Sequence, residues 1–176
     1  SEGTKIEELL RLKEISMKAG LGLTLKIGGC ESIRDMLEAR TIGVNYLVAP
    51  MIESPYALRK YLQAVSGVIP EEEKKHIEIL CNIETITAFD CFDEILEIPE
   101  IETLNGIVVE RVDLCFSMGK KEDCVNDPEI NDIVEKTIVK AKKKNLTCIV
   151  GGGVSAHCLP FFRQVAEGKL DRIETR

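Results

Sequence analysis

The fold is decided by two stretches, Ile77-Glu-Ile-Leu-Cys-Asn-Ile-Glu84 and, further along, Leu104-Asn-Gly-Ile-Val-Val109. Both are short apolar runs of the kind that form buried strands of a parallel sheet. Glu84 closes the first run, and Asp113 comes shortly after the second. Because neighbouring parallel strands lie about 4.8 Å apart, we expect both carboxylates to face one small space at the same sheet edge.

The alternation of strand and helix extends from one end of the chain to the other. We predict strands at 23–27, 45–52, 77–83, 106–109 and 146–150, and the start of a sixth at 170–175. Helices are predicted to begin at a Thr4–Glu7 capping box and at Ser54-Pro55, and to cover 32–40, 85–97, 128–144 and 160–167. Residues 71–75 are interpreted as a charged surface connection, and 115–125 as an ordinary charged loop or a mobile lid.

Repeating strand–helix units imply an α/β fold with a parallel sheet and helical crossovers. A doubly wound sheet typically carries GxGxxG after its first strand, and this sequence has none. A (β/α)8 barrel instead spreads its chemistry over the carboxyl ends of several strands, where Lys26, Glu84, Asp113 and the glycines 151–153 fall. We therefore predict one TIM-type barrel domain over residues 1–176. It is expected to lack terminal strands, since about six can be counted and a complete barrel needs about 250 residues.

Composition excludes several classes of protein. The 176 residues are 44% hydrophobic and 30% charged, as in ordinary soluble globular domains. A net charge of −7 gives no basic footprint for nucleic acid. No apolar run reaches membrane-spanning length and no signal peptide opens the chain, so we expect no membrane partner. Seven cysteines without a CxxC pair indicate a reducing, cytoplasmic setting.

Glu84 and Asp113 together predict a metal site. Two hard carboxylates, with room for water and a bidentate substrate, suit Mg²⁺ or Mn²⁺. Each acid also has a structural interpretation, since Glu84 could favour a helix dipole and Asp113 could cap a turn. Their position at the ends of adjacent strands favours the metal site over two unrelated structural roles.

Three segments resemble one known family. The motifs 82–85 (NIET) and 110–114 (ERVDL), with 45–51 (NYLVAPM) before them, are similar to the HpcH/HpaI aldolase and citrate lyase β-subunit superfamily, and the likeness extends over about 23–154. The resemblance implies a phosphoenolpyruvate/pyruvate-type barrel. It also implies that Glu84 and Asp113 bind the metal and that the backbone N–H groups of Val112 and Asp113 bind a 2-oxo acid carboxylate.

The chain departs from the family pattern at several positions. Lys26, in Leu25-Lys26-Ile27-Gly28-Gly29, stands nearest to the place of a substrate-holding arginine, and we assign Gly28 of that segment to substrate binding. Lysine keeps the charge of arginine but not its bidentate fork. Glu110 stands where the family often has glycine, and Arg111 and Val112 replace small residues. These changes bear on the reaction more than on the fold.

The resemblance implies a metal-dependent carbon–carbon lyase of the class II aldolase type, acting on a 2-oxo acid such as pyruvate plus an aldehyde. A divalent cation would stabilise the enolate as a Lewis acid, and Lys26 would add positive charge beside it. The alternatives are an acyl-CoA lyase of the citrate lyase β-subunit type and a non-catalytic barrel subunit. A homo-oligomer is expected by resemblance. His157, the glycines 151–153, Glu174 and Arg176 are weaker site candidates.

Overall fold

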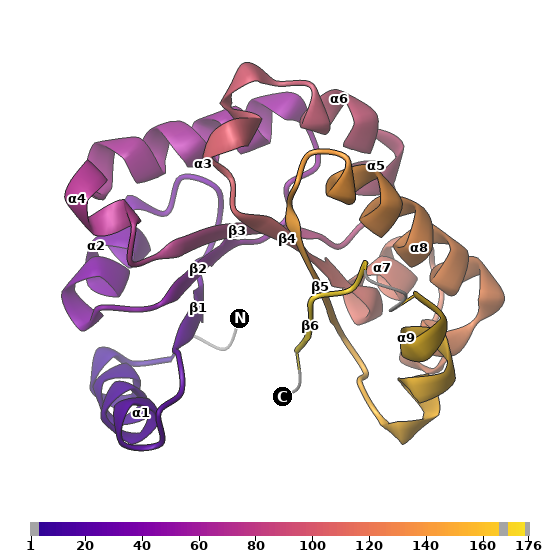
Figure 1. The fold of residues 1–176 in the computed structure, drawn as a ribbon, viewed down its shortest axis with the longest axis horizontal. Helices are drawn as coiled ribbons and strands as arrows, with labels where there is room; N and C mark the ends of the chain where they lie inside the picture. The colour runs from indigo at the N-terminus through magenta and orange to yellow at the C-terminus, as the bar shows by residue number, and fades with distance from the viewer. Residues whose placement is uncertain (1–3, 166–168, 175–176) are drawn as a thin grey trace.

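The protein is a curled, open sheet with helices on its outside (Figure 1). The computed structural model describes residues 4–165 and 169–174. Six strands form one sheet in the order β1-β2-β3-β4-β5-β6, and every neighbouring pair is parallel. The strands are β1 Thr24–Lys26, β2 Tyr46–Ala49, β3 Glu78–Ile83, β4 Gly106–Glu110, β5 Thr147–Gly151 and β6 Arg172–Ile173.

The sequential strand order decides between the two predicted architectures. A doubly wound sheet reverses its strand order at a switch point, whereas a barrel adds each new strand on the same side. Here each strand pairs with the one before it along the chain, and the sheet curls as it grows (Figure 1). The prediction of an incomplete TIM-type barrel is confirmed.

Helices follow the strands and cover the convex face of the sheet (Figure 1). They are α1 Ile6–Lys18, α2 Ile33–Ile42, α3 Pro55–Val68, α4 Glu71–Lys74, α5 Ile86–Asp90, α6 Phe92–Leu96, α7 Arg111–Ser117, α8 Pro128–Lys142 and α9 Leu159–Val165, with 3₁₀ turns η1 Pro99–Thr103, η2 Glu122–Asn126 and η3 Ala156–Cys158. Among the described residues, no helix has both the length and the apolar content needed to cross a membrane.

Alternation along the strands divides the apolar side chains between two clusters. Cys81, Ile83 and Val109 belong to the large core that the helices cover. Val48, Leu80, Val108 and Ile149 form a separate small cluster on the inner face, against which Tyr46 packs. Because successive side chains of a strand point to opposite faces, polar residues two positions from the inner cluster also face inward.

A cross-sheet contact joins distant strands on this inner face. Both terminal nitrogens of Arg172 in β6 donate to the carboxylate of Glu78 in β3, at 3.0 and 2.9 Å. The Arg172 guanidinium also lies 5.1 Å from the centre of the Tyr46 ring in β2. The curl of the sheet brings these strands together although β4 and β5 separate them in the hydrogen-bonded order.

Several predicted boundaries were wrong. The strand predicted for 45–52 ends at Ala49, because Pro50 cannot donate a ladder hydrogen bond and Met51 has φ +53°. The predicted 85–97 helix is two helices, since Cys91 at φ −87° and ψ 3° interrupts it and turns Phe92 into the core. Residues 71–75, interpreted as a connection, include the short helix α4.

The first helix begins one residue later than predicted, since its N-cap is Lys5 rather than Thr4. Glu8, and not Glu7, accepts a hydrogen bond from the N-cap N–H, at 3.1 Å. The Ser54-Pro55 start is confirmed, with Ser54 Oγ accepting from Ala57 N–H at 3.1 Å. Residues 166–167 and 175, at the ends of the last predicted helix and strand, lie outside the described part of the chain.

Candidate active site

A polar cleft of about 710 Å³ lies at the carboxyl ends of the strands. Its lining residues come from β1 to β4, from α7 and η2, from the loop after β5 and from the residue that follows β6. It is lined by Thr24, Lys26, Val48, Asn82, Glu110, Val112, Asp113, Phe116, Glu122, Gly152, Gly153, Val154 and Glu174. This is the end of a barrel at which function is expected.

Glu84 lies directly behind this cleft and is fully buried. Its Oε1 accepts a hydrogen bond from Met51 N–H at 2.8 Å, and its Oε2 accepts one from Asn82 Nδ2 at 2.7 Å. The Lys26 ammonium, which lines the cleft, lies 3.5 Å from the same Oε2. Buried carboxylates are normally accommodated by hydrogen-bond donors and a nearby positive charge of this kind.

Only the nitrogen of the Asn82 side-chain amide bonds to Glu84. The side chain is 2% exposed and lines the cleft. Its Oδ1 accepts no hydrogen bond from any residue that the structure describes. Asn82 pairs in register with Val108 of the inner cluster, so it points to the concave side of the sheet. An acceptor without a donor is thus present on the cleft wall, a feature that the sequence did not indicate.

Asp113 lies in the first turn of helix α7 and lines the cleft together with Val112. The N-cap of this helix is Glu110, whose Oε2 accepts a hydrogen bond from Asp113 N–H at 2.9 Å. One of the two backbone donors that the family resemblance assigns to a substrate carboxylate is therefore engaged by a carboxylate of the chain itself. The glutamate that replaces the usual glycine has a structural role as a helix cap.

Gly28 is the predicted site residue that does not join the others. Its N–H donates to Asp35 Oδ2 at 2.7 Å, and it is not among the cleft-lining residues. A Cβ at Gly28 would lie 3.2 Å from the same Asp35 oxygen. The structure places this glycine in the loop before α2, bonded to Asp35 of that helix, while Lys26, two residues earlier, lines the cleft.

Arg111 is the residue whose importance sequence reasoning missed. It is fully buried, and its guanidinium donates to the carbonyls of Gly151, Gly152 and Val125 at 3.2, 2.7 and 3.2 Å. It therefore ties the loop after β5 and the η2 turn to the start of α7. The sequence signal was only an unusual residue in the motif, and burial of an arginine cannot be read from that.

The sulfur of Cys158 accepts from Arg111 Nη2 at 3.3 Å, and Phe162 stacks beneath the guanidinium with its ring centre 5.1 Å away. Burial raises the pKa of the Cys158 thiol, but hydrogen bonds and charge from Arg111, with help from Ser155, outweigh it and leave that pKa below its ordinary value. The Cys158 thiol thus helps to hold the Arg111 guanidinium and does not line the cleft.

The glycine loop contributes backbone rather than side chains. Gly152 has φ +75°, and a Cβ there would lie 2.6 Å from Glu110 Oε1 and 2.7 Å from the nitrogens of Arg111 and Val112. Only glycine allows this close approach between the loop and the start of α7. Gly152 and Gly153 line the cleft, as the barrel interpretation of the triplet expects.

The remaining candidate residues differ in whether they line the cleft. Glu174 lines the cleft, whereas Arg176 lies outside the described residues. His157 is exposed and does not line the cleft. Within 4–165 and 169–174, no three His, Cys, Asp or Glu side chains are grouped to hold a metal ion. The predicted pair of carboxylates would therefore need oxygen ligands from outside that set, such as substrate or water.

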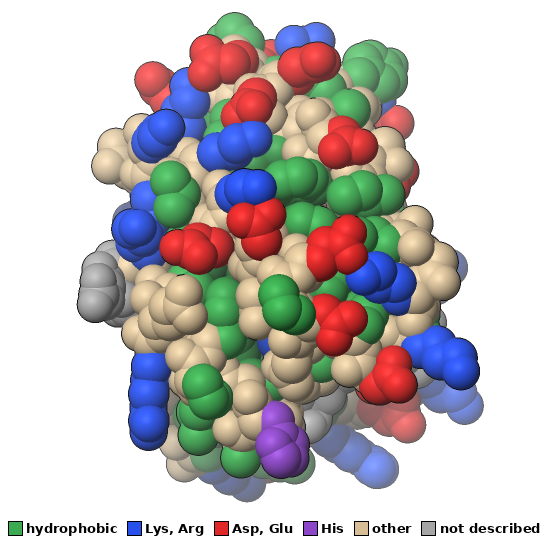
Figure 2. Space-filling view, turned by 90° about the vertical axis from the view of Figure 1, so that its right-hand side faces the viewer, with side chains coloured by type: hydrophobic (Ala, Val, Ile, Leu, Met, Phe, Trp, Pro, Cys, Tyr) green, Lys and Arg blue, Asp and Glu red, His purple; other side chains and the backbone are tan. Residues whose placement is uncertain are grey.

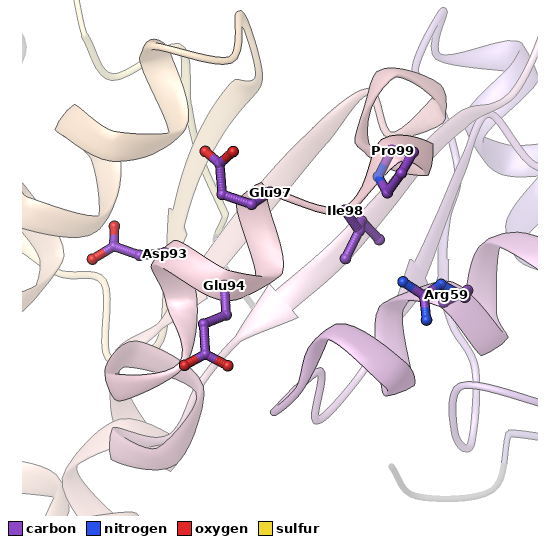
Figure 3. Close-up of a pocket in the computed structure, with 6 residues that line it drawn as sticks. All are labelled: Arg59, Asp93, Glu94, Glu97, Ile98 and Pro99. Carbon is purple, nitrogen blue, oxygen red and sulfur yellow. The ribbon is translucent and has the colours of Figure 1, made fainter.

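A second hollow, of about 400 Å³, lies on the helical outside between α3 and the α6–η1 segment (Figure 3). Its lining residues are Arg59, Asp93, Glu94, Glu97, Ile98 and Pro99. Arg59 is paired with Glu100 at 3.3 Å, and Asp93 with Lys140 at 2.8 Å. These residues lie on the outer helices and not at the strand ends, so this hollow is not the candidate active site.

The outer face that carries α8 mixes charges of both signs, with apolar side chains between them (Figure 2). Along α8, Lys136 pairs with Asp132 at 2.6 Å and Lys140 pairs with Asp93. Lys144 pairs with Glu97 at 2.9 Å. The face in this view therefore shows no continuous basic patch.

The model of the HpcH/HpaI aldolase/citrate lyase family matches residues 18–156. The chain belongs to this family. The match covers well over half of the chain and includes both acidic motifs, the Lys26 segment and the glycine loop. The predicted family resemblance is confirmed, and with it a lyase-type function at the level of the family. No curated protein matches the sequence.

Solved structures agree with the fold of this HpcH/HpaI family member. Citrate synthase SbnG is 16% identical with a TM-score of 0.78, covering 98% of this chain and 72% of that one. An HpcH/HpaI aldolase from Desulfitobacterium hafniense DCB-2 is 15% identical with a TM-score of 0.77, covering 98% and 73%. A family protein from Burkholderia cenocepacia J2315 is 13% identical with a TM-score of 0.76, covering 96% and 74%. At these identities the likeness concerns the fold.

Proposed function

We propose that this family member is a metal-dependent carbon–carbon lyase of the class II aldolase type. Its substrate would be a 2-oxo acid such as pyruvate, joined to or released from an aldehyde. The observation that carries the proposal is the grouping at one cleft of Lys26, Asn82 and Asp113, with Glu84 buried directly behind them. The three segments that supply these groups are far apart in the sequence and meet at the carboxyl ends of the strands.

The residues present fit a divalent cation. Glu84 and Asp113 supply hard carboxylate oxygens, and the unpaired Oδ1 of Asn82 is an oxygen acceptor in the same wall. Each oxygen of the Glu84 carboxylate accepts one hydrogen bond, from Met51 N–H or from Asn82 Nδ2, and so keeps a further lone pair. Mg²⁺ or Mn²⁺, when bound, would polarise the keto group of the substrate as a Lewis acid.

The chain's own groups would orient the substrate and balance its charge. Lys26 carries the positive charge nearest to Glu84 and would favour negative charge developing on a bound keto oxygen. Val112 N–H remains the candidate backbone donor for a substrate carboxylate, because Asp113 N–H is already bonded to Glu110. Arg111, which does not line the cleft, would act indirectly by fixing the loop and the helix that form this wall.

One observation favours a second candidate, a non-catalytic barrel subunit. Glu84 already has Lys26 as a cationic neighbour, so the buried acid could serve only to hold β1 and β3 together. This alternative predicts that the protein binds neither divalent metal nor a 2-oxo acid. It differs from the lyase proposal in a property that binding alone can measure.

The test is calorimetric titration of pyruvate with and without Mg²⁺ or Mn²⁺. The wild type is compared with Glu84→Ala and Asp113→Ala, and with Asp132→Asn as a control on the exposed surface of α8. We expect metal-dependent pyruvate binding that both site variants abolish and the control retains. Absence of metal and pyruvate binding in the folded wild type would favour the non-catalytic barrel.

The proposal also covers the cellular compartment, the oligomeric state and the partners of the protein. We propose a cytoplasmic homo-oligomer with no nucleic-acid or membrane partner, the oligomer by family resemblance. The seven cysteines are all free, as a reducing compartment would leave them.

A further inference from the structure

One exposed aromatic side chain lines the candidate active site. Phe116, in helix α7, is 54% exposed, and among the large apolar side chains that are exposed in the described part of the chain it alone lines the cleft. The other phenylalanines of the chain are buried or half-buried. An exposed apolar residue elsewhere on the surface would need no explanation. Ligand clefts, by contrast, use aromatic side chains to contact the apolar parts of a ligand.

The helical spacing of α7 explains how Phe116 reaches the cleft. Leu114 and Cys115 are buried in the core that the helices cover. Residues three and four positions apart share a face of a helix, so Phe116 lies on the same face as Val112 and Asp113, which also line the cleft. A large apolar residue therefore occupies the face that α7 presents to the cleft rather than the buried face of the helix.

Further apolar side chains belong to the same wall of the cleft. Val112 and Val154 are half-buried and line the cleft. The glycine loop that precedes Val154 passes against the start of α7, where a Cβ at Gly152 would lie 2.7 Å from Val112 N. The polar groups Lys26 and Asn82 enter from β1 and β3 instead. The cleft thus has an apolar surface on α7 and the loop after β5, apart from these polar groups.

We propose that Phe116 is a specificity residue of the cleft, whose ring contacts an apolar substituent on the aldehyde half of the substrate. The inference rests on the proposed function and deepens it by naming a class of aldehyde, one with an aliphatic or aromatic substituent. In the proposed function the 2-oxo acid lies at Glu84 and Asp113, and Phe116 follows Asp113 by about one helical turn. The substituent of an aldehyde that approaches the 2-oxo acid along α7 would therefore meet this ring.

An ammonium group is the alternative occupant beside Phe116. Glu122 and Glu174 are exposed and line the cleft, and an aromatic face together with carboxylates can bind a cation. We favour the apolar substituent because Val112 and Val154 border the same wall as Phe116, and an aliphatic side chain offers a cation no favourable contact.

Aldehydes of equal length separate these possibilities. Butanal, 3-hydroxypropanal and 3-aminopropanal end in a methyl, a hydroxyl and an ammonium group. Each is combined with pyruvate and Mn²⁺, and kcat/KM for the aldehyde is measured from the 4-hydroxy-2-oxo acid that forms. We expect the wild type to prefer butanal over 3-hydroxypropanal by about tenfold or more. Phe116→Ala should reduce this preference to about threefold or less, and Phe116→Leu should keep most of it.

Tyr56→Ala is the matched control for loss of an aromatic ring. Tyr56 is 66% exposed and does not line the cleft. Its variant should therefore keep the wild-type ratio of kcat/KM values between butanal and 3-hydroxypropanal. Because the inference concerns the change in this ratio between proteins, differences in the intrinsic reactivity of the aldehydes cancel.

Three results would overturn the inference while leaving the proposed function intact. The first is that Phe116→Ala keeps the wild-type preference as Tyr56→Ala does. The second is that the wild type prefers 3-aminopropanal and Phe116→Ala loses that preference, which would assign the ring to an ammonium group. The third is that Phe116→Ala, but not Tyr56→Ala, dissociates an oligomer in sedimentation, which would mean that a second copy covers the ring.

The wild type tests the proposed function separately. If it binds no pyruvate in the presence of Mn²⁺, or forms no product from any of the aldehydes, the proposed function fails and this inference fails with it. If it binds pyruvate and forms product, only the comparison of Phe116→Ala with Tyr56→Ala decides the role of the ring.

Discussion

Lys26 and Glu84 lie opposite each other across β2, with Lys26 Nζ 3.5 Å from Glu84 Oε2. The glutamate is fully buried, and the lysine side chain is 26% exposed at the cleft. The pair connects β1 to β3 at the end of the sheet where the family motifs meet. It also places one positive charge beside the carboxylate that we assign to the metal.

Replacing this lysine should affect both stability and binding. Lys26→Met leaves Glu84 buried without its cationic neighbour, and we expect the free energy of unfolding to fall by about 1–2 kcal/mol at neutral pH. Lys26→Arg keeps the charge and should lose less. Urea unfolding of the three proteins checks this, and equal midpoints for wild type and Lys26→Met would show that the pair contributes no stability.

Arg111 should be among the most sensitive positions of the chain. Arg111→Met leaves three buried carbonyls without their donor, and we expect a loss of about 3 kcal/mol or more in the free energy of unfolding. Arg163→Met, on the exposed side of α9, should stay within about 0.5 kcal/mol of wild type. Similar unfolding midpoints for the two variants would contradict the supporting role given to Arg111.

Comparing alanine substitutions at Gly152 and Gly20 distinguishes the stability cost of backbone conformation from the cost of steric contact. Both have positive φ, +75° and +68°, but a Cβ at Gly20 meets nothing within 4 Å. Gly20→Ala should therefore cost about 1–2 kcal/mol from conformation alone. Gly152→Ala should cost about 1–3 kcal/mol more, because its Cβ would meet Glu110 and the start of α7. Thermal unfolding measures the difference, and equal losses would mean that the junction adapts without strain.

Asp171 should contribute to acid stability at the edge of the sheet. Burial raises the pKa of this carboxyl, but hydrogen bonds from Cys148 N–H, at 2.7 Å, and from Lys142 outweigh it and leave the pKa below its ordinary 3.8. Since the unfolded chain binds this proton more tightly, the stabilisation is present above about pH 4 and is lost as the pH falls through the lowered pKa. The acid limb of Asp171→Asn should be shallower than that of wild type, as measured by unfolding between pH 5 and 2. An unchanged slope would exclude this linkage.

Much of the fold could be predicted because its signals are local. Buried strands of a parallel sheet are apolar on both faces, and Ser54-Pro55 marks a helix boundary through its own backbone preferences. Where local preference and tertiary context competed, the prediction failed. Cys91 breaks a segment that has helical composition, since Phe92 turns into the core there.

The sequence by itself determined that Lys26, Glu84 and Asp113 lie at or shortly after the ends of strands, because strand ends are visible in the apolar pattern. Only the tertiary structure decided that Gly28 turns away to Asp35, that Glu110 caps α7 and that Arg111 is buried beneath the glycine loop. It also left the Asn82 oxygen without a donor. These contacts depend on how tightly the sheet curls and on register between distant segments. A short-range residue pattern contains no information on the curl of the sheet or on the register between distant segments.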